Sequence, residues 1–266
     1  MTHKEKQIGV EEYVDYWNES HRKLREKRVH RKEEIQELTH YGMVFLVDNL
    51  VNPQKGDFIL ELGCGEGERL KNYEKICSVR GIDISQKMLE QATRNLSKGK
   101  VIFANMENLP FEDEVFDKVV AVYSMVYSPN KLKVMKEVSR VLKQNGEFIV
   151  YEPNKISLKV LQSFLASVKL SISGEKTKAL HHKILIRKSL SYLQFKKLGS
   201  KANLNISYWR GHFSYHLALL AINNNILTDI TLFIFKILLY RKWGTIPIVK
   251  FFSDFLIIKF VKEKTK

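Results

Sequence analysis

The chain has 266 residues, of which 44% are hydrophobic, and this length fits one α/β domain with an elaboration or one domain with a small cap. Its two cysteines, Cys64 and Cys77, form no C-x-x-C pair, so the sequence predicts no disulfide framework and no metal site. The formal net charge of +15 is placed unevenly, because residues 155–266 carry 20 basic and only 4 acidic side chains. This asymmetry favours an anionic partner for the second part of the chain: a lipid surface, a phosphorylated substrate or nucleic acid.

The N-terminal segment shows helical spacing of aromatic side chains. Tyr13 and Trp17 lie one helical turn apart, and residues 41–50 form a second, more apolar pattern of the same period. We expect residues 1–50 to form a helical lid; the alternative is an aromatic stripe that packs on the domain. The segment has no apolar core of the signal-peptide type, which predicts a cytoplasmic protein, with peripheral contact at the inner face of a membrane as a further expectation.

A glycine-rich turn follows the first predicted strand. An apolar run from Phe58 ends at Glu61, and three glycines then alternate with other residues before a predicted helix. The glycines are Gly63, Gly65 and Gly67. Strand, tight turn and helix is the arrangement by which an α/β sheet binds a cofactor across its strand ends.

The spacing of this turn distinguishes two kinds of cofactor. It differs from the G-x-G-x-x-G pattern that places helix N–H groups against a pyrophosphate. The carboxylates of Glu61, Glu66 and Glu68 would repel a pyrophosphate, whereas they suit a ligand that carries a cation. The sulfonium and ammonium of S-adenosylmethionine are such cations.

The next elements alternate between strand and helix. A short strand ends at Asp83, and Ser85 is placed to cap the helix that follows it. Further strands are predicted at 101–104, 116–123 and 147–151, with helices at 86–96 and 131–142. Five such βα units with short turns predict a doubly wound, mostly parallel sheet.

Four sequence segments, in this order and spacing, resemble the class I S-adenosylmethionine-dependent methyltransferases. The segments are ILELGCGEG at 59–67, GIDIS at 81–85, NMENLPFEDEVFDKVV at 105–120 and KEVSRVLKQNGEFIVYEPN at 136–154. The most similar branch is the one that includes ubiquinone/menaquinone-biosynthesis and many small-molecule methyltransferases. The resemblance covers about residues 56–154 and implies a cofactor-binding core at 51–154, with S-adenosylmethionine as the cofactor.

The resemblance implies roles at the matching positions. Glu61, Gly63 and Gly65 would hold the methionine end, Asp83 the ribose, and Ile84 the adenine ring. Asn105 and Met106 would meet the adenine edge, and Gly67 and Tyr123 complete the expected cofactor set. The family usually has Asp where Asn105 stands, although an amide oxygen can still accept a hydrogen bond.

The C-terminal part is expected to complete the sheet. Strand six is predicted at 203–208 and strand seven at 255–260, antiparallel and last in the sheet, within a unit spanning 155–266. Two apolar, basic insertions, 155–180 and 211–252, would form a helical cap that chooses the substrate. They suit an interfacial helix or a lipophilic tunnel; a cap that packs on itself is the alternative.

Tyr127 and His181 are the candidates for a catalytic base, and Glu152 and His212 are weaker ones. His181 matches a family position, whereas Tyr127 stands where the family often has His and would be a poorer base with an ordinary pKa near 10. The leading function is methyl transfer to a small, lipophilic or lipid- or phosphate-linked acceptor. The alternatives are an RNA methyltransferase, with aromatic residues such as Phe195 available for stacking, and an inactive cofactor-binding partner subunit. The sequence predicts no particular oligomeric state.

Overall fold

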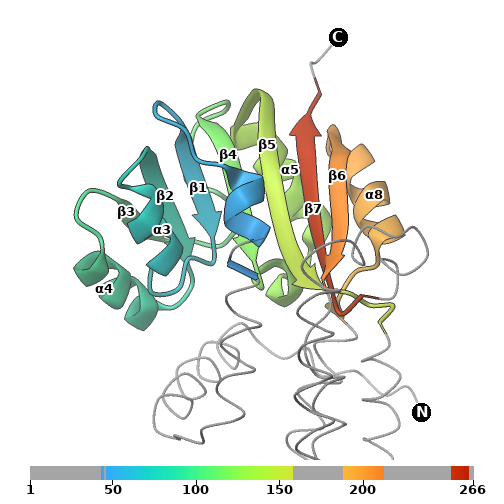
Figure 1. The fold of residues 1–266 in the computed structure, drawn as a ribbon, viewed down its shortest axis with the longest axis horizontal. Helices are drawn as coiled ribbons and strands as arrows, with labels where there is room; N and C mark the ends of the chain where they lie inside the picture. Colours follow the sequence, from blue (N-terminus) through green and yellow to red (C-terminus); the bar gives the residue numbers. More distant parts are fainter. Residues whose placement is uncertain (1–42, 45, 158–187, 213–252, 264–266) are drawn as a thin grey trace, which may run out of the picture.

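The computed structural model describes residues 43–44, 46–157, 188–212 and 253–263. In these ranges the chain forms a seven-stranded sheet in the order β3-β2-β1-β4-β5-β7-β6, with helices on both faces (Figure 1). This confirms the expected doubly wound, mostly parallel α/β fold. The predictions for the N-terminal lid up to residue 42, for His181 and for most of both insertions lie outside the described residues.

The first half of the sheet follows the predicted alternation of strand and helix. Its elements are β1 (Phe58–Leu62), α3 (Glu68–Tyr73), β2 (Ser78–Asp83), α4 (Gln86–Asn95) and β3 (Lys100–Phe103). As predicted, Ser85 caps α4, because its side chain accepts a hydrogen bond from the Met88 N–H. Helix α3 ends at Tyr73, because the N–H groups of Ile76 and Cys77 both donate to the Tyr73 carbonyl and turn the chain toward β2.

The second half adds β4, β5 and the C-terminal strands. Its elements are β4 (Phe116–Val122), the 3-10 turn η1 (Met125–Tyr127), α5 (Lys131–Val141), β5 (Leu142–Pro153), α8 (Tyr192–Ser200), β6 (Leu204–His212) and β7 (Phe255–Lys262). Strand β5 begins five residues earlier than predicted, since Leu142 already pairs with Phe116 across a register shift.

Strand β7 runs antiparallel to both its neighbours, as predicted, but it does not lie at the edge of the sheet. It inserts between β5 and β6, so that β6 is the edge strand. The physical reason is burial on both faces: Ile258 and Phe260 belong to one apolar core, and Ile257 belongs to the other. The fully buried residues of β7 hold its backbone N–H and C=O groups away from water, so both edges of the strand need a hydrogen-bonding partner, whereas β6 exposes Tyr208.

Two apolar cores cover the two faces of the sheet, and the polar ends of its parallel strands lie at one edge. One contains Leu60, Val119 and Phe148, and the other contains Ile59, Val120 and the N-terminal helix residue Val47. Because β1, β2 and β4 are parallel, their carboxyl ends meet at the same edge of the sheet, where cofactor sites form in such folds. Among the described residues no helix is long and apolar enough to cross a membrane.

Candidate functional site

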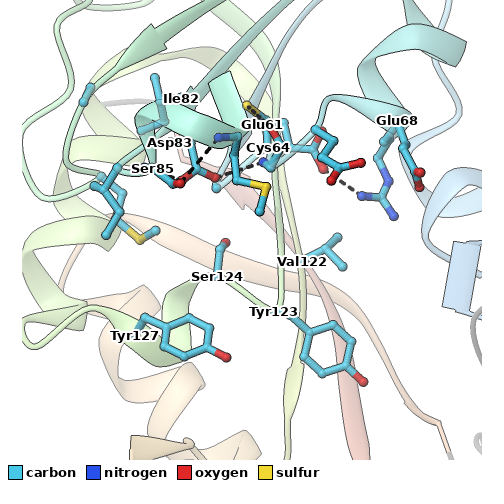
Figure 2. Close-up of a pocket in the computed structure, with 18 of the residues that line it drawn as sticks. Glu61, Cys64, Glu68, Ile82, Asp83, Ser85, Val122, Tyr123, Ser124 and Tyr127 are labelled. Carbon is cyan, nitrogen blue, oxygen red and sulfur yellow. Dashed lines mark hydrogen bonds and ion pairs between the residues drawn. The ribbon is translucent and has the colours of Figure 1, made fainter. Parts of the chain in front are cut away.

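A cavity of about 660 Å³ opens at the carboxyl ends of the central parallel strands (Figure 2). Its walls come from the N-terminal helical residues Met43, Val44 and Asp48, the glycine turn after β1, helix α3, the end of β2, the segment after β3 and the turn after β4. The lining residues that carry the argument are Asp48, Glu61, Gly63, Gly65, Arg69, Asp83, Ile84, Met106, Tyr123, Ser124 and Tyr127. This volume is in the range of ordinary small-molecule sites.

The glycine turn brings the backbone close to the cavity. Gly63 and Gly65 have φ angles of 69° and 52°, in the left-handed region that favours glycine. A Cβ on Gly63 would lie 2.5 Å from the Ser124 Cβ, so this position has no room for a side chain. A Cβ on Gly65 would meet no atom within 4 Å, which leaves space beside the backbone for a ligand.

Glu61 offers one unpaired acceptor inside the site. The side chain is 4% exposed, and its Oε1 accepts a hydrogen bond from Arg69 Nη1 at 2.7 Å. Its Oε2 is buried and has no hydrogen-bond partner among the described residues. Burial raises the pKa of Glu61, while the ion pair with Arg69 acts in the opposite direction. A buried carboxylate oxygen without a donor is the feature that a ligand ammonium would satisfy.

Asp83 ends β2 opposite the glycine turn and is held by backbone N–H groups. Its Oδ2 accepts from Gly65 N–H and its Oδ1 from Ser85 N–H, both at 2.9 Å. Burial raises the pKa of this carboxyl, and the backbone hydrogen bonds oppose that rise. Each oxygen retains a lone pair, so the oriented carboxylate can accept the two hydroxyls of a ribose.

The turn after β4 faces these carboxylates across the cavity. Tyr123 takes a left-handed backbone conformation, with a φ of 53°, and Tyr127 follows one turn later. Between them, the Ser124 Oγ is buried without a hydrogen-bond partner among the described residues. Figure 2 shows Tyr123 and Tyr127 on the side of the cavity opposite Asp83, with Ser124 between.

Glu152 holds this turn from behind. It is 2% exposed and accepts backbone N–H groups from Ser124, Met125 and Val126 at 2.8, 2.6 and 3.2 Å. Burial raises its pKa to about 8, against the effect of these donors and of Lys131. Because its oxygens are engaged and it does not line the cavity, Glu152 acts on the turn as a structural acceptor and not as the base considered from the sequence.

A series of polar side chains, Tyr123, Tyr151 and His212, extends away from the cavity. The side chains of Tyr123 and Tyr151 share a hydrogen bond, and the Tyr151 hydroxyl lies 2.7 Å from His212 Nδ1. Burial lowers the pKa of His212 to about 4, so this histidine is neutral at physiological pH. His212 therefore pairs with Tyr151 behind the cavity wall and does not line the cavity itself.

Most of the predicted cofactor residues meet at the cavity, but two do not line it. Gly67 begins α3, and a Cβ there would lie 3.2 Å from the Ala92 Cβ, so it serves the packing of α3 on α4. Asn105 uses its Oδ1 to accept from the Glu107 N–H at 2.9 Å, so this oxygen is held within its own turn. Phe195, considered for base stacking, is 1% exposed and belongs to the core.

The structure adds four polar residues to the cavity that the sequence did not single out. Asp48 comes from the N-terminal helix, Arg69 and Asn72 from α3, and Ser124 from the turn after β4. Arg69 follows directly after Glu68, but nothing in the pattern shows that it turns back to Glu61. The sequence carries no signal for Ser124 either, because only the packing against Gly63 reveals its position.

Comparisons with known proteins show what the chain is similar to. A family model described as a methyltransferase domain matches residues 60–150. An uncharacterized protein of Methanocaldococcus jannaschii is 32% identical over 182 residues, which is 65% of each chain. The demethylmenaquinone methyltransferase of Thermotoga maritima is 34% identical over 105 residues, or 38% of this chain and 44% of that protein.

Among solved structures, the fold is shared with a geranyl diphosphate methyltransferase in complex with GPP and sinefungin. The TM-score is 0.54 at 15% identity, over 82% of this chain and 76% of that one. The chain thus spans between 44% and 65% of the two curated relatives named above.

Proposed function

Because the chain belongs to the class I S-adenosylmethionine-dependent methyltransferases, in the ubiquinone/menaquinone-like branch, we propose that it methylates a small, lipophilic or lipid- or phosphate-linked acceptor. The observation that carries the proposal is the division of one cavity into two unlike walls. Carboxylates occupy one wall, and the aromatic side chains of Tyr123 and Tyr127 occupy the other (Figure 2).

The carboxylate wall suits the cofactor. The unpaired Oε2 of Glu61 can accept a hydrogen bond from the ammonium of the methionine part, and Asp83 can accept the ribose hydroxyls. The open space beside Gly65 lets a ligand approach the backbone. When bound, S-adenosylmethionine supplies an activated methyl group, and the protein's task is to align the acceptor with it and to exclude water.

The aromatic wall suits an apolar acceptor. Tyr123 packs against Tyr151 and Phe255, with ring centroids 5.2 Å apart in each pair, so its ring is fixed by an aromatic cluster. Tyr127 is carried by a turn that Glu152 holds, and it remains the candidate to orient or deprotonate an acceptor hydroxyl. The related menaquinone-pathway enzyme and the geranyl diphosphate enzyme bear names that indicate lipophilic substrates, which supports an acceptor of that class.

The basic second part of the chain supports contact with an anionic lipid surface. The described residues 188–212 carry five basic and no acidic side chains, and α8 exposes Leu193, 64% accessible, near Lys196 and Lys197. An apolar side chain among lysines favours a membrane interface. We further propose that residues 1–50 cover the cofactor cavity, since Met43, Val44 and Asp48 already line it.

Calorimetry with S-adenosylmethionine tests the cofactor first. Wild type is expected to bind with micromolar affinity, and Asp83→Ala to lose most of that affinity because the ribose acceptor is removed. Binding that survives unchanged in Asp83→Ala would place the cofactor elsewhere. If wild type binds no S-adenosylmethionine, the proposed methyltransferase activity is refuted. That result would favour the alternative of an inactive partner subunit, one that has also lost cofactor binding.

Transfer of a radioactive methyl group then identifies the acceptor class. We expect incorporation into a lipid extract and not into total RNA, with phosphatidylglycerol vesicles raising the rate and phosphatidylcholine vesicles leaving it unchanged. Incorporation into RNA alone would instead support the nucleic-acid alternative.

A further inference from the structure

Arg69 links the carboxylate of the cofactor wall to the N-terminal helix. Its Nη1 donates to Glu61 Oε1 at 2.7 Å, and its Nε donates to Asp48 Oδ1 at 3.2 Å. The Tyr73 hydroxyl donates to the same Asp48 oxygen at 2.6 Å. The Arg69 side chain is 12% exposed, so the guanidinium is held between β1, α3 and residues 43–51 with little access to water.

This arrangement determines which oxygen of Glu61 faces a ligand. Since Arg69 engages Oε1, only Oε2 remains without a partner among the described residues. Without the guanidinium, a carboxyl 4% exposed would tend to take up a proton and would also be free to rotate. A protonated carboxyl would be a weak acceptor for a ligand ammonium, because the charge attraction would be lost.

The positive charge of Arg69 does not by itself repel a cationic ligand. Two carboxylates, Asp48 and Glu61, flank the one guanidinium, so the group of three carries a net charge of −1 when all are ionised. The Tyr73 hydroxyl donates a hydrogen bond to Asp48 and holds this carboxylate in place. Asp48 in turn holds the Arg69 guanidinium in its orientation beside Glu61. The local field therefore still favours a cation beside Glu61 Oε2.

We propose that Arg69 is a positioning residue that acts through Glu61 and gives the site its preference for ligands that carry an ammonium. Asp48 and Tyr73 support it by holding the guanidinium in place. The proposal rests on the proposed function, because it assumes that the methionine part of the cofactor lies beside Glu61. It differs from direct binding of the ligand's carboxylate by Arg69, and the two roles make opposite predictions in a Glu61 variant.

Calorimetry with two ligands tests this role. S-adenosylhomocysteine carries the ammonium and the carboxylate of the methionine part, whereas 5′-methylthioadenosine carries neither. Arg69→Gln is expected to weaken S-adenosylhomocysteine binding by about tenfold, the effect of a lost charge-assisted hydrogen bond, and to change 5′-methylthioadenosine binding less than twofold. Arg94→Gln on α4 is the matched control, since Arg94 donates to the exposed Glu90 carbonyl and does not line the cavity.

A double-mutant cycle with Glu61→Gln separates the indirect role from a direct one. If Arg69 acts through Glu61, adding Arg69→Gln to Glu61→Gln causes no further loss of S-adenosylhomocysteine affinity. A further loss in that background would show direct contact with the ligand carboxylate and would overturn the proposal. An equal loss of both ligands in Arg69→Gln would also overturn it, because it would indicate collapse of the whole site.

Two further outcomes keep the test interpretable. Should Arg69→Gln fail to fold, Arg69→Lys keeps the charge but cannot donate to Asp48 and Glu61 in the same planar geometry. It is then expected to weaken S-adenosylhomocysteine binding alone, by a smaller factor, and a loss of both ligands would again overturn the proposal. A wild type that binds neither ligand would refute the proposed function itself, whereas the outcomes above refute only the role of Arg69.

Discussion

The carboxyl group of Glu152 accepts the backbone N–H of Ser124 at 2.8 Å and thereby ties the end of β5 to the turn that follows β4. The next two N–H groups of the turn donate to the same carboxyl group, at 2.6 and 3.2 Å. Because this group is 2% exposed, water does not compete for these donors. One side chain thus orders the backbone that brings Ser124 and Tyr127 to the cavity.

Removing this acceptor is expected to destabilise the fold. Glu152→Ala leaves three buried N–H groups without a partner and should lower the free energy of unfolding by about 3 kcal/mol or more. Glu152→Gln keeps one acceptor oxygen and should lose about 1–2 kcal/mol. Urea unfolding at pH 7 measures both losses. The control is Glu147→Gln, which removes a partly exposed ion pair with Lys259. It is expected to lower the free energy of unfolding by less than about 1 kcal/mol. Losses no larger than this control would contradict the role of Glu152.

The same residue predicts a pH dependence of stability. Burial raises the pKa of Glu152 from 4.5 to about 8 in the folded chain. The unfolded chain therefore releases this proton at lower pH than the folded chain does. Stability should fall as the pH rises from about 4.5 to about 8 and should then level off. Glu152→Gln cannot titrate, so its free energy of unfolding should change less between about pH 4.5 and 8 than that of wild type. Urea unfolding at several pH values measures this difference. Equal slopes of unfolding free energy against pH for the two proteins would show that Glu152 does not titrate in this range.

Gly63→Ala should weaken cofactor binding. The new Cβ would lie 2.5 Å from the Ser124 Cβ, and the φ of 69° is strained for any residue with a side chain. We expect at least a tenfold weaker affinity for S-adenosylmethionine by calorimetry and about 1–2 kcal/mol lower stability. Gly56→Ala is the control, because it has a φ of 96° but no atom within 4 Å of its added Cβ. Gly56→Ala should share the strain but keep the affinity; an equal loss of affinity would exclude the collision as the cause.

Ser124→Ala should separate ligand binding from stability. The Ser124 Oγ has no hydrogen-bond partner among the described residues, so its removal should change the free energy of unfolding by less than about 0.5 kcal/mol. If the hydroxyl bonds the methionine part beside Gly63, S-adenosylhomocysteine should bind about two- to tenfold more weakly. Ser124→Cys offers a matched variant of similar size with a weaker donor. Unchanged affinity for S-adenosylhomocysteine in both variants would show that the Ser124 hydroxyl does not contact the cofactor.

The sequence alone predicted the parts of the fold that local pattern determines. The glycine spacing after Glu61, the acidic end of the second strand at Asp83 and the apolar runs placed the parallel strands and their binding edge. These features are readable because turn geometry and strand burial act over a few neighbouring residues. The same logic predicted Ser85 as the cap of α4.

Only the tertiary structure decided which distant residues meet. Strand β7 lies between β5 and β6, because its buried backbone needs a hydrogen-bonding partner at each edge. Arg69 turns toward Glu61 and Asp48, and Glu152 accepts hydrogen bonds from the turn after β4. The hydrogen bond between Glu152 and Ser124 spans 28 positions of the sequence, and the pairing of β5 with β7 brings Glu147 and Lys259, 112 positions apart, into contact. No local sequence pattern encodes pairings over such separations.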